Sequence, residues 1–268
     1  MSHTVPHDLA GFTQSSFTHD GISRPVYAGG TGPAVVVIHE VPGLHPGVVE
    51  FAQRVVDAGF SVRMPSLFGT PGRDVSAGYT MRTLVEVCVA REFTAFALDR
   101  TSPVIGWLRR LAAEAHAECG GPGVGAVGMC FTGGFALGMM VDDTMLAPVL
   151  SQPSLPFPVT RSRRQAVGVS DADLARVKER ATAGACLMGL RFTHDAAVPE
   201  ARFDTLRRAL GDAFIAVEID SSKGNPHGIP RRAHSVLTEH LVDEPGHPTR
   251  EALDRVLAFF ADRLHPGA

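Results

Sequence analysis

The chain has 268 residues and a formal net charge of −3, from 25 basic residues (lysine and arginine) and 28 acidic ones. With 44% hydrophobic and 20% charged residues, it has enough apolar side chains for a large core, which excludes a disordered or fibrous chain. The near balance of charge gives no general attraction to nucleic acid phosphates or to acidic membranes, so we expect neither as a partner.

The four cysteines are too scattered for a metal site, a redox pair or a disulfide framework, because the closest two lie eleven residues apart. The sequence also contains no HExxH motif and no glycine motif that binds nucleotides, so we expect no metal and no cofactor. The first residues lack the basic and apolar segments of a secretory signal. We therefore expect a cytoplasmic protein, with a flexible segment over residues 1–11.

The first half of the chain predicts a hairpin followed by strands and helices in turn. Asp20-Gly21 between two alternating runs indicates a hairpin turn, and the β-branched run over Ala34–Ile38 is typical of a strand covered on both faces. The expected elements are a hairpin over 12–19 and 22–27, a strand over 34–38, a helix over 48–56, a strand over 60–64, a loop over 65–79, and helices near 81–98 and 103–118.

The second half continues this alternation and ends in a helix with an apolar stripe. The expected elements are a strand over 124–129, a sharp turn, a helix over 135–141, a strand over 146–150, an irregular stretch to about 168, a helix near 171–183, a strand over 185–190, a helix near 199–210, a strand over 213–219 and a helix over 253–264. The pattern predicts an α/β fold with a mostly parallel central sheet, helices on both faces and an N-terminal β-hairpin. No repeat or linker divides the chain, so we expect a single domain over 1–268.

In such sheets ligands bind beyond the carboxyl ends of the strands, and one of these ends carries a cysteine. Cys130 lies in the segment GMCFTGG (128–134), directly after a predicted strand and before a predicted helix. Glycines permit a tight turn that exposes the side chain, and a helix N-terminus favours a thiolate. The alternative is that Cys130 is only a small residue filling a glycine-rich turn.

Other predicted strand ends carry an acid and two histidines that could form a catalytic triad with Cys130. Asp195 follows the strand over 185–190, and both His227 and His234 follow the strand over 213–219. A carboxylate of this kind orients a catalytic imidazole, and the order nucleophile, acid, histidine is the chain order of α/β-hydrolases. Either histidine can serve as the base, and Asp195 can equally be a helix cap.

Four segments together resemble the dienelactone hydrolase family of cysteine α/β-hydrolases, over about residues 20–264. They are VVIHEVPGL (36–44), GMCFTGG (128–134), HDAAVP (194–199) and AHS (233–235). The resemblance implies the α/β-hydrolase fold and a Cys130–His234–Asp195 triad that cleaves a lactone or activated carboxylic ester through a thioacyl-enzyme. It further implies that Glu40 lies against Cys130 and regulates its charge. The backbone N–H groups of Val41 and Phe131 form the oxyanion hole by the same resemblance.

Two positions differ from the family pattern. Thr132 stands where the family usually has glycine, and Thr238 stands where it has an arginine four residues after the histidine. The family spacing to the closing helix favours His234, but His227 does have Arg231 four residues later.

Three arginines are candidates to pair with an anionic substrate. They are Arg73, Arg82 and Arg231, of which Arg82 and Arg231 are our choice.

The sequence leaves two other functions open. One is a hydrolase of other esters or thioesters, and the other is a non-catalytic α/β domain in which Cys130 senses redox state. In the enzymatic interpretation the partner is a small-molecule ester or lactone, and the protein is a monomer or homodimer.

Overall fold

Eight strands form one central sheet in residues 9, 11–93 and 100–265, the part of the chain that the computed structural model describes. The strands are β1 (Thr13–His19), β2 (Ile22–Gly29), β3 (Ala34–Ile38), β4 (Ser61–Pro65), β5 (Val124–Met129), β6 (Met145–Ser151), β7 (Leu187–Phe192) and β8 (Phe214–Ile219). The helices are α1 (Pro46–Asp57), α2 (Ala77–Val89), α3 (Pro103–Cys119), α4 (Phe135–Met139), α5 (Arg161–Gln165), α6 (Asp171–Thr182), α7 (Glu200–Leu210) and α8 (Pro248–Leu264), with the short 3₁₀ turns η2 (Cys130–Thr132) and η3 (Gly211–Ala213).

The strand order β1-β2-β4-β3-β5-β6-β7-β8 confirms the predicted fold class. β1 pairs with β2 and β2 pairs with β4 in antiparallel fashion, while the pairs from β4 through β8 are all parallel. The carboxyl ends of β3, β5, β6, β7 and β8 therefore meet along one edge of the sheet, where parallel sheets place their ligands.

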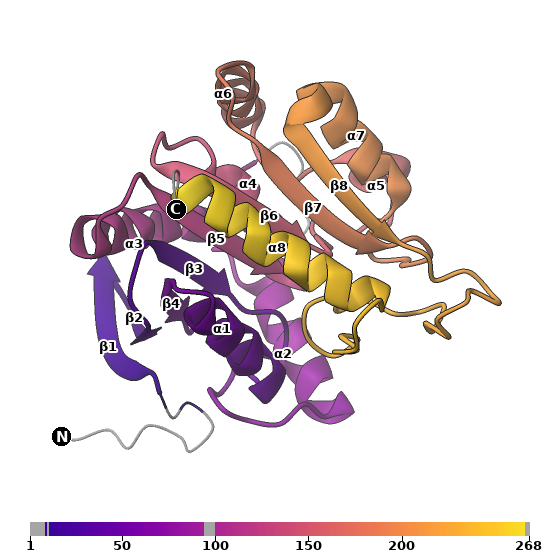
Figure 1. Cartoon of the computed structure of the whole chain (residues 1–268), viewed down its shortest axis with the longest axis horizontal. Coiled ribbons are helices and arrows are strands. Elements are labelled where there is room, and N and C mark those ends of the chain that lie inside the picture. The colour runs from indigo at the N-terminus through magenta and orange to yellow at the C-terminus, as the bar shows by residue number, and fades with distance from the viewer. Residues whose placement is uncertain (1–8, 10, 94–99, 266–268) are drawn as a thin grey trace.

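Helices cover both faces of the sheet, which gives the molecule two apolar cores. Alternate residues of β3 point to opposite faces, and all five are buried, as the β-branched run predicts. Val35 and Val37 pack in one core with α1 and α8, while Val36 and Ile38 pack in the other with α3 and α4. Figure 1 shows α1 and α8 crossing the near face of the sheet.

The structure shifts a few predicted boundaries. α2 begins at Ala77, because Ser76 caps it by accepting a hydrogen bond from the backbone N–H of Tyr79 at 3.4 Å. The helix also ends earlier than predicted, at Val89, because Ala90 has an extended backbone, with φ of −71° and ψ of 124°. The predicted end near 98 lies outside the described residues. A short helix, α5, occupies part of the stretch expected to be irregular, and β7 runs two residues further than predicted.

The expected flexible segment over 1–11 falls largely outside the described residues, although the described Leu9 is fully buried. Within the described part of the chain, no helix combines the length and the apolar character that a membrane span requires.

A buried arginine on α7 holds together the segment after β6. Arg202 is 1% exposed and donates hydrogen bonds to four backbone carbonyls, at 2.5–3.0 Å, those of Pro153, Pro156, Arg163 and Ala166. No carboxylate among the described residues pairs with it. Burial lowers the pKa of Arg202 to about 10, which leaves the guanidinium charged at neutral pH. Its five N–H donors thus act as a local scaffold for an otherwise irregular chain.

Replacing Arg202 should destabilise the fold, mainly because its hydrogen bonds to backbone carbonyls are lost and only to a smaller extent because apolar contacts are lost. Arg202→Leu leaves two buried and two partly buried carbonyls without this donor, so we expect the free energy of unfolding to fall by about 3 kcal/mol or more. Urea unfolding measures this. Arg208→Ala on the exposed side of the same helix is the matched control, and a loss as small as the control's would contradict the role assigned to Arg202.

Candidate active site

Cys130 lies on a sharp turn at the carboxyl end of β5. Its φ of 52° is in the left-handed region, which residues with a Cβ adopt only when their surroundings require it. Neighbouring glycines make this turn possible, because a Cβ on Gly128 would lie 2.3 Å from the carbonyl oxygen of Thr132. A Cβ on Gly133 would lie 2.5 Å from the Cα of Pro153. The turn thus presents a partly exposed thiol at the end of the sheet that the sequence predicted.

Thr132, which stands where the family usually has glycine, uses its hydroxyl to fasten this turn to β3. Its Oγ1 lies 3.0 Å from the carbonyl oxygen of Ile38 and 3.1 Å from that of His39, and it accepts a hydrogen bond from the Met129 N–H at 3.1 Å. Thr132 is fully buried. The departure from the family pattern therefore adds a link between two strand ends rather than disturbing the turn.

His234 and Asp195 form a hydrogen-bonded pair next to Cys130. His234 Nδ1 lies 2.6 Å from Asp195 Oδ2, while Asp195 Oδ1 accepts from the Ala197 N–H at 2.9 Å. Burial alone would lower the pKa of His234, but the neighbouring Cys130 thiolate and the Asp195 carboxylate outweigh it and raise that pKa well above its usual value. With Nδ1 donating to Asp195, Nε2 is left to exchange a proton with the thiol or with water.

The other predicted site residues lie elsewhere. His227 is exposed and packs its ring against His247, with ring centroids 5.4 Å apart, at the side of β8 and α8. Asp195 binds His234 and not His227 in the described structure. Arg82 is exposed and pairs with Glu86 on α2, with Nε and Oε1 2.9 Å apart, and Arg231 is also exposed. Contact of either arginine with a substrate stays a prediction.

Glu40 is buried beside this set, with four side-chain donors around its carboxylate. They are His45 Nε2 at 3.2 Å, Gln152 Nε2 at 3.2 Å, Ser235 Oγ at 2.7 Å, and Thr238 Oγ1. Burial raises the pKa of Glu40, but its hydrogen bonds, that from His45 first, outweigh this effect and lower it, so the carboxylate is ionised. Among the described residues, Cys130 is not one of its hydrogen-bond partners. Ser235 and Thr238 follow His234 on the same loop, so Glu40 ties that loop to the end of β3.

The proposed oxyanion donors lie on the two strand ends that carry Glu40 and Cys130. Val41 directly follows Glu40, and Phe131 directly follows Cys130 in η2. Neither backbone N–H donates a hydrogen bond to another described residue. Both are therefore available to an oxygen atom bound at this edge of the sheet.

His39 is fully buried behind the turn and is held neutral. Its Nε2 accepts a hydrogen bond from the Leu67 N–H at 2.9 Å, so the proton lies on Nδ1, which donates to the Glu40 carbonyl oxygen at 3.0 Å. Burial lowers the pKa of His39 from 6.5 to about 4. This histidine is therefore a structural connection between β3 and the loop after β4.

This shift predicts a stability that falls in acid. Between pH 6.5 and about 4 the unfolded chain binds a proton at His39 and the folded chain does not, so the free energy of unfolding decreases as the pH decreases. The contribution is about 3 kcal/mol over that range. His39→Gln should show a flatter pH dependence in urea unfolding between pH 7 and pH 4. Parallel curves for the variant and the wild type would contradict the assignment.

Three residues of the site were missed by the sequence analysis: Ser154, Gln152 and His45. Ser154 Oγ lies 3.7 Å from Cys130 Sγ. Gln152 adopts a left-handed φ of 35° and accepts a hydrogen bond from the Val236 N–H at 3.3 Å, which joins the end of β6 to the His234 loop. The only signal for the first two was their position directly after a predicted strand.

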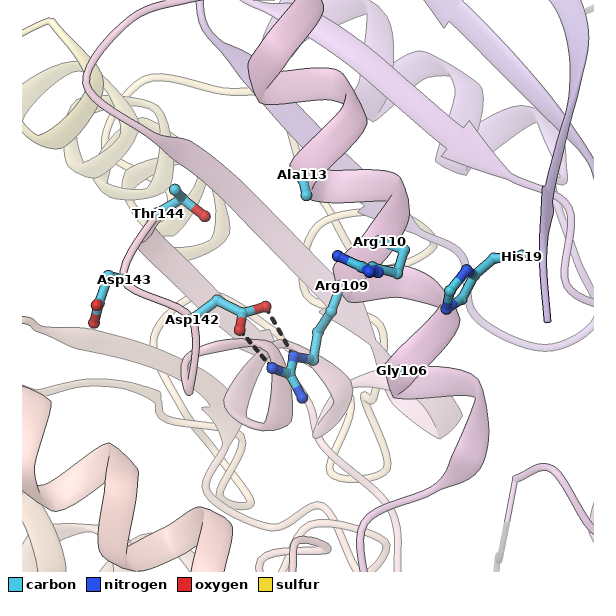
Figure 2. A pocket seen from close by; sticks show the side chains of 8 residues that line it. All are labelled: His19, Gly106, Arg109, Arg110, Ala113, Asp142, Asp143 and Thr144. Carbon is cyan, nitrogen blue, oxygen red and sulfur yellow. Dashed lines mark hydrogen bonds and ion pairs between the residues drawn. The ribbon is translucent and has the colours of Figure 1, made fainter.

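Two surface hollows lie away from this set. One has a volume of about 480 Å³ and is lined by the residues in Figure 2, on α3 and on the turn before β6. There Arg109 pairs with Asp142 through two hydrogen bonds, drawn in Figure 2. Thr144 accepts a hydrogen bond from Val124, the first residue of β5, so this hollow is at the amino ends of the strands and opposite to Cys130. It contains ion pairs but no nucleophile.

Comparison with known proteins agrees with this fold. The model of the dienelactone hydrolase family matches residues 22–264. A hydrolase fragment of Escherichia coli (strain K12), YghX, is 42% identical over 55 residues, which is 19% of this chain and 47% of that protein, so the match spans about half of the relative's length.

Solved structures share the fold at low sequence identity. A Klebsiella pneumoniae protein assigned to the dienelactone hydrolases matches with a TM-score of 0.63 and 19% identity, covering 93% of this chain and 98% of that one. The dienelactone hydrolase of Anabaena variabilis matches with a TM-score of 0.58 and 17% identity, covering 94% and 98%. A dienelactone hydrolase-like promiscuous phosphotriesterase from metagenomic libraries matches with a TM-score of 0.59 and 18% identity, over the same shares.

Proposed function

Because the chain belongs to the dienelactone hydrolase family, we propose that it hydrolyses a lactone or an activated carboxylic ester with a Cys130–His234–Asp195 triad. The observation that carries this proposal is the 2.6 Å contact between His234 and Asp195, with the imidazole beside a thiol on a left-handed turn. Nucleophile, base and orienting acid come from three different strand ends, which is the arrangement that covalent acyl transfer needs.

The reaction has two halves. The Cys130 thiolate attacks the substrate carbonyl carbon, and the N–H groups of Val41 and Phe131 stabilise the oxyanion. The bond from carbon to the leaving oxygen then breaks, and this oxygen takes the proton of the His234 imidazolium, which leaves the imidazole neutral. His234, oriented by Asp195, then removes a proton from water, which attacks the thioester and releases the acid. The raised pKa of His234 supports the first half, since an imidazolium stabilises the thiolate before the substrate arrives.

The partner in this proposal is a small molecule, and the place of action is the cytoplasm. A nucleophilic thiol keeps its activity only while it stays reduced, and the four cysteines are unpaired. Aromatic rings cluster beside the nucleophile. The rings of Phe68, Phe93 and Phe131 contact one another with centroids 5.5–5.8 Å apart. His39 lies 4.4 Å from Phe68, and Phe157 lies 6.2 Å from Phe131. This surrounding favours an acyl group with apolar or aromatic character.

Two comparisons test the triad. Cys130→Ala and His234→Ala should each lower kcat/KM for an activated aryl ester by about a thousandfold or more, while His227→Ala should stay within about twofold of wild type.

Iodoacetamide should label Cys130 faster than Cys88, read by mass spectrometry of the intact chain and its fragments. A screen of lactones, enol esters and aryl esters against wild type and Cys130→Ala then identifies the substrate class.

Ester turnover that survives in Cys130→Ala, together with labelling of Cys130 no faster than that of Cys88, would overturn the assignment of Cys130 as the nucleophile. An equal loss in His227→Ala and His234→Ala would reject the assignment of the base.

We propose that Glu40 regulates the Cys130 thiol through its negative charge. Its four hydrogen-bond donors support this role, because they hold the ionised carboxylate in one position. A carboxylate held in place near the nucleophile disfavours a second negative charge on sulfur, which limits adventitious oxidation of the thiol. The same carboxylate anchors the His234 loop through Ser235. The two effects can be separated, because Ser235→Ala removes an anchor and keeps the charge.

Glu40→Gln should therefore lower the pH at which Cys130 is half-maximally alkylated by about 0.5 pH unit, whereas Ser235→Ala should leave that pH unchanged. The measurement is the iodoacetamide labelling rate of Cys130 between pH 4 and pH 10. An unchanged midpoint in Glu40→Gln would restrict Glu40 to anchoring the loop.

A further inference from the structure

The hydroxyl of Ser154 is buried against the sulfur of Cys130, which is its one hydrogen-bond partner among the described residues. Ser154 is 1% exposed, and its Oγ lies 3.7 Å from Cys130 Sγ. No other hydrogen bond of this hydroxyl occurs within the described residues. A buried hydroxyl normally has a strong partner, because leaving it without one costs free energy.

The backbone around Ser154 holds the hydroxyl in this position. The Ser154 N–H donates to the carbonyl oxygen of Cys130 at 3.0 Å. The preceding Pro153 packs so closely on Gly133 that a Cβ there would come within 2.5 Å of the Pro153 Cα. Arg202 binds the Pro153 carbonyl at 2.6 Å and the Pro156 carbonyl at 2.5 Å, one on each side of the serine. The contact between Oγ and Sγ is therefore built into the fold.

A thiol and a thiolate differ strongly as partners for this hydroxyl. The sulfur of a neutral thiol is a weak acceptor and its S–H a weak donor, whereas hydrogen bonds to a charged acceptor are about twice as strong as neutral ones. The hydrogen bond from the Ser154 O–H is therefore strongest when Cys130 is ionised, so it stabilises the thiolate relative to the thiol.

We propose that Ser154 is a catalytic residue that donates a hydrogen bond to the Cys130 thiolate, an inference that rests on the proposed function. It acts together with His234, which faces the same sulfur from the loop after β8. The serine supplies a neutral donor with no proton to lose at ordinary pH, and the histidine supplies the charge. Ser154 therefore holds the thiolate also when His234 has given up its proton.

The contribution changes through the reaction in a defined way. As the bond between sulfur and the carbonyl carbon forms, the negative charge leaves sulfur and the hydroxyl loses its strong acceptor. The bond from carbon to the leaving oxygen then breaks, and that oxygen takes the proton of the His234 imidazolium. In the second half, water oxygen bonds to the carbonyl carbon and its proton passes to His234. The bond from carbon to sulfur then breaks, and the electron pair returns to sulfur, where the Ser154 hydroxyl stabilises it as the leaving group.

The test is the pH dependence of Cys130 alkylation by iodoacetamide in the full-length protein, resolved by fragment mass spectrometry. Ser154→Ala should raise the pH of half-maximal labelling by about 0.5 to 1 pH unit and leave the plateau rate at high pH unchanged. Ser154→Thr retains a hydroxyl and should keep the wild-type midpoint. Ser61→Ala, which removes another buried serine hydroxyl far along the sheet in β4, is the control and should also keep it.

Steady-state kinetics add a second readout. Below the labelling midpoint, Ser154→Ala should lower kcat for an aryl ester about three- to tenfold with little change in KM. If Ser154→Ala does not fold, as judged by circular dichroism, Ser154→Gly removes the same hydroxyl and takes its place.

Two results would overturn the proposal while leaving the triad intact. One is a pH of half-maximal labelling in Ser154→Ala equal to that of wild type. The other is a shift of that pH in Ser154→Thr as large as in Ser154→Ala. Failure of the proposed function gives a different result, because ester turnover would then persist in Cys130→Ala whatever the labelling of Cys130 shows.

Discussion

Cys130 holds a left-handed backbone conformation, and contacts with three neighbouring strands keep it there. Gly128 lets the chain fold back on itself, Thr132 hydrogen-bonds the carbonyls at the end of β3, and the Ser154 N–H bonds the Cys130 carbonyl from the end of β6. A conformation that costs free energy on its own persists only when its surroundings determine it in several ways. The direction of the thiol, and with it every contact to the base and the acceptor oxygen, depends on this turn.

Two buried carboxylates from different strand ends organise the charge in the site. Asp195 contacts the imidazole of His234, whereas Glu40 contacts Ser235 and Thr238, which follow His234 in the same loop. Thr238 stands where the family has an arginine, so the Glu40 carboxylate accepts hydrogen bonds from a neutral hydroxyl there and from His45. A site that lacks a fixed cation there has less to offer a substrate carboxylate, which shifts the expected substrates toward uncharged esters.

Much of the fold follows from periodicity in the sequence. The run over β3, the hairpin at Asp20-Gly21 and the strand–turn–helix around Cys130 all appear in the structure within a few residues of their predicted positions. Cys130 and Asp195 could be nominated because each directly follows a strand, and strand ends in a parallel sheet are brought together by topology alone.

The other features of the site could not be predicted, because they depend on the path of loops, which hydrophobic periodicity does not describe. His227 and His234 share one loop, and which of them meets Asp195 is set by turns such as those that Asn225 makes with Ser222 and Ile229. Ser154 and Gln152 lie in a proline-rich stretch whose shape depends on Arg202, an arginine 50 residues further along the chain. No local pattern reveals a buried guanidinium of this kind, since its partners are carbonyls that any residue carries.

The tie between Glu40 and Ser235 joins positions 195 residues apart, and this separation has a consequence for how activity appears during folding. Contacts of such long range form late, since the entropy of closing the loop must be overcome first. A chain in which β3 and β5 have formed but the loop after β8 has not docked lacks both the Glu40–Ser235 bond and the Asp195–His234 bond. The surroundings of Cys130 are therefore complete only when segments from nearly the whole described chain have come together.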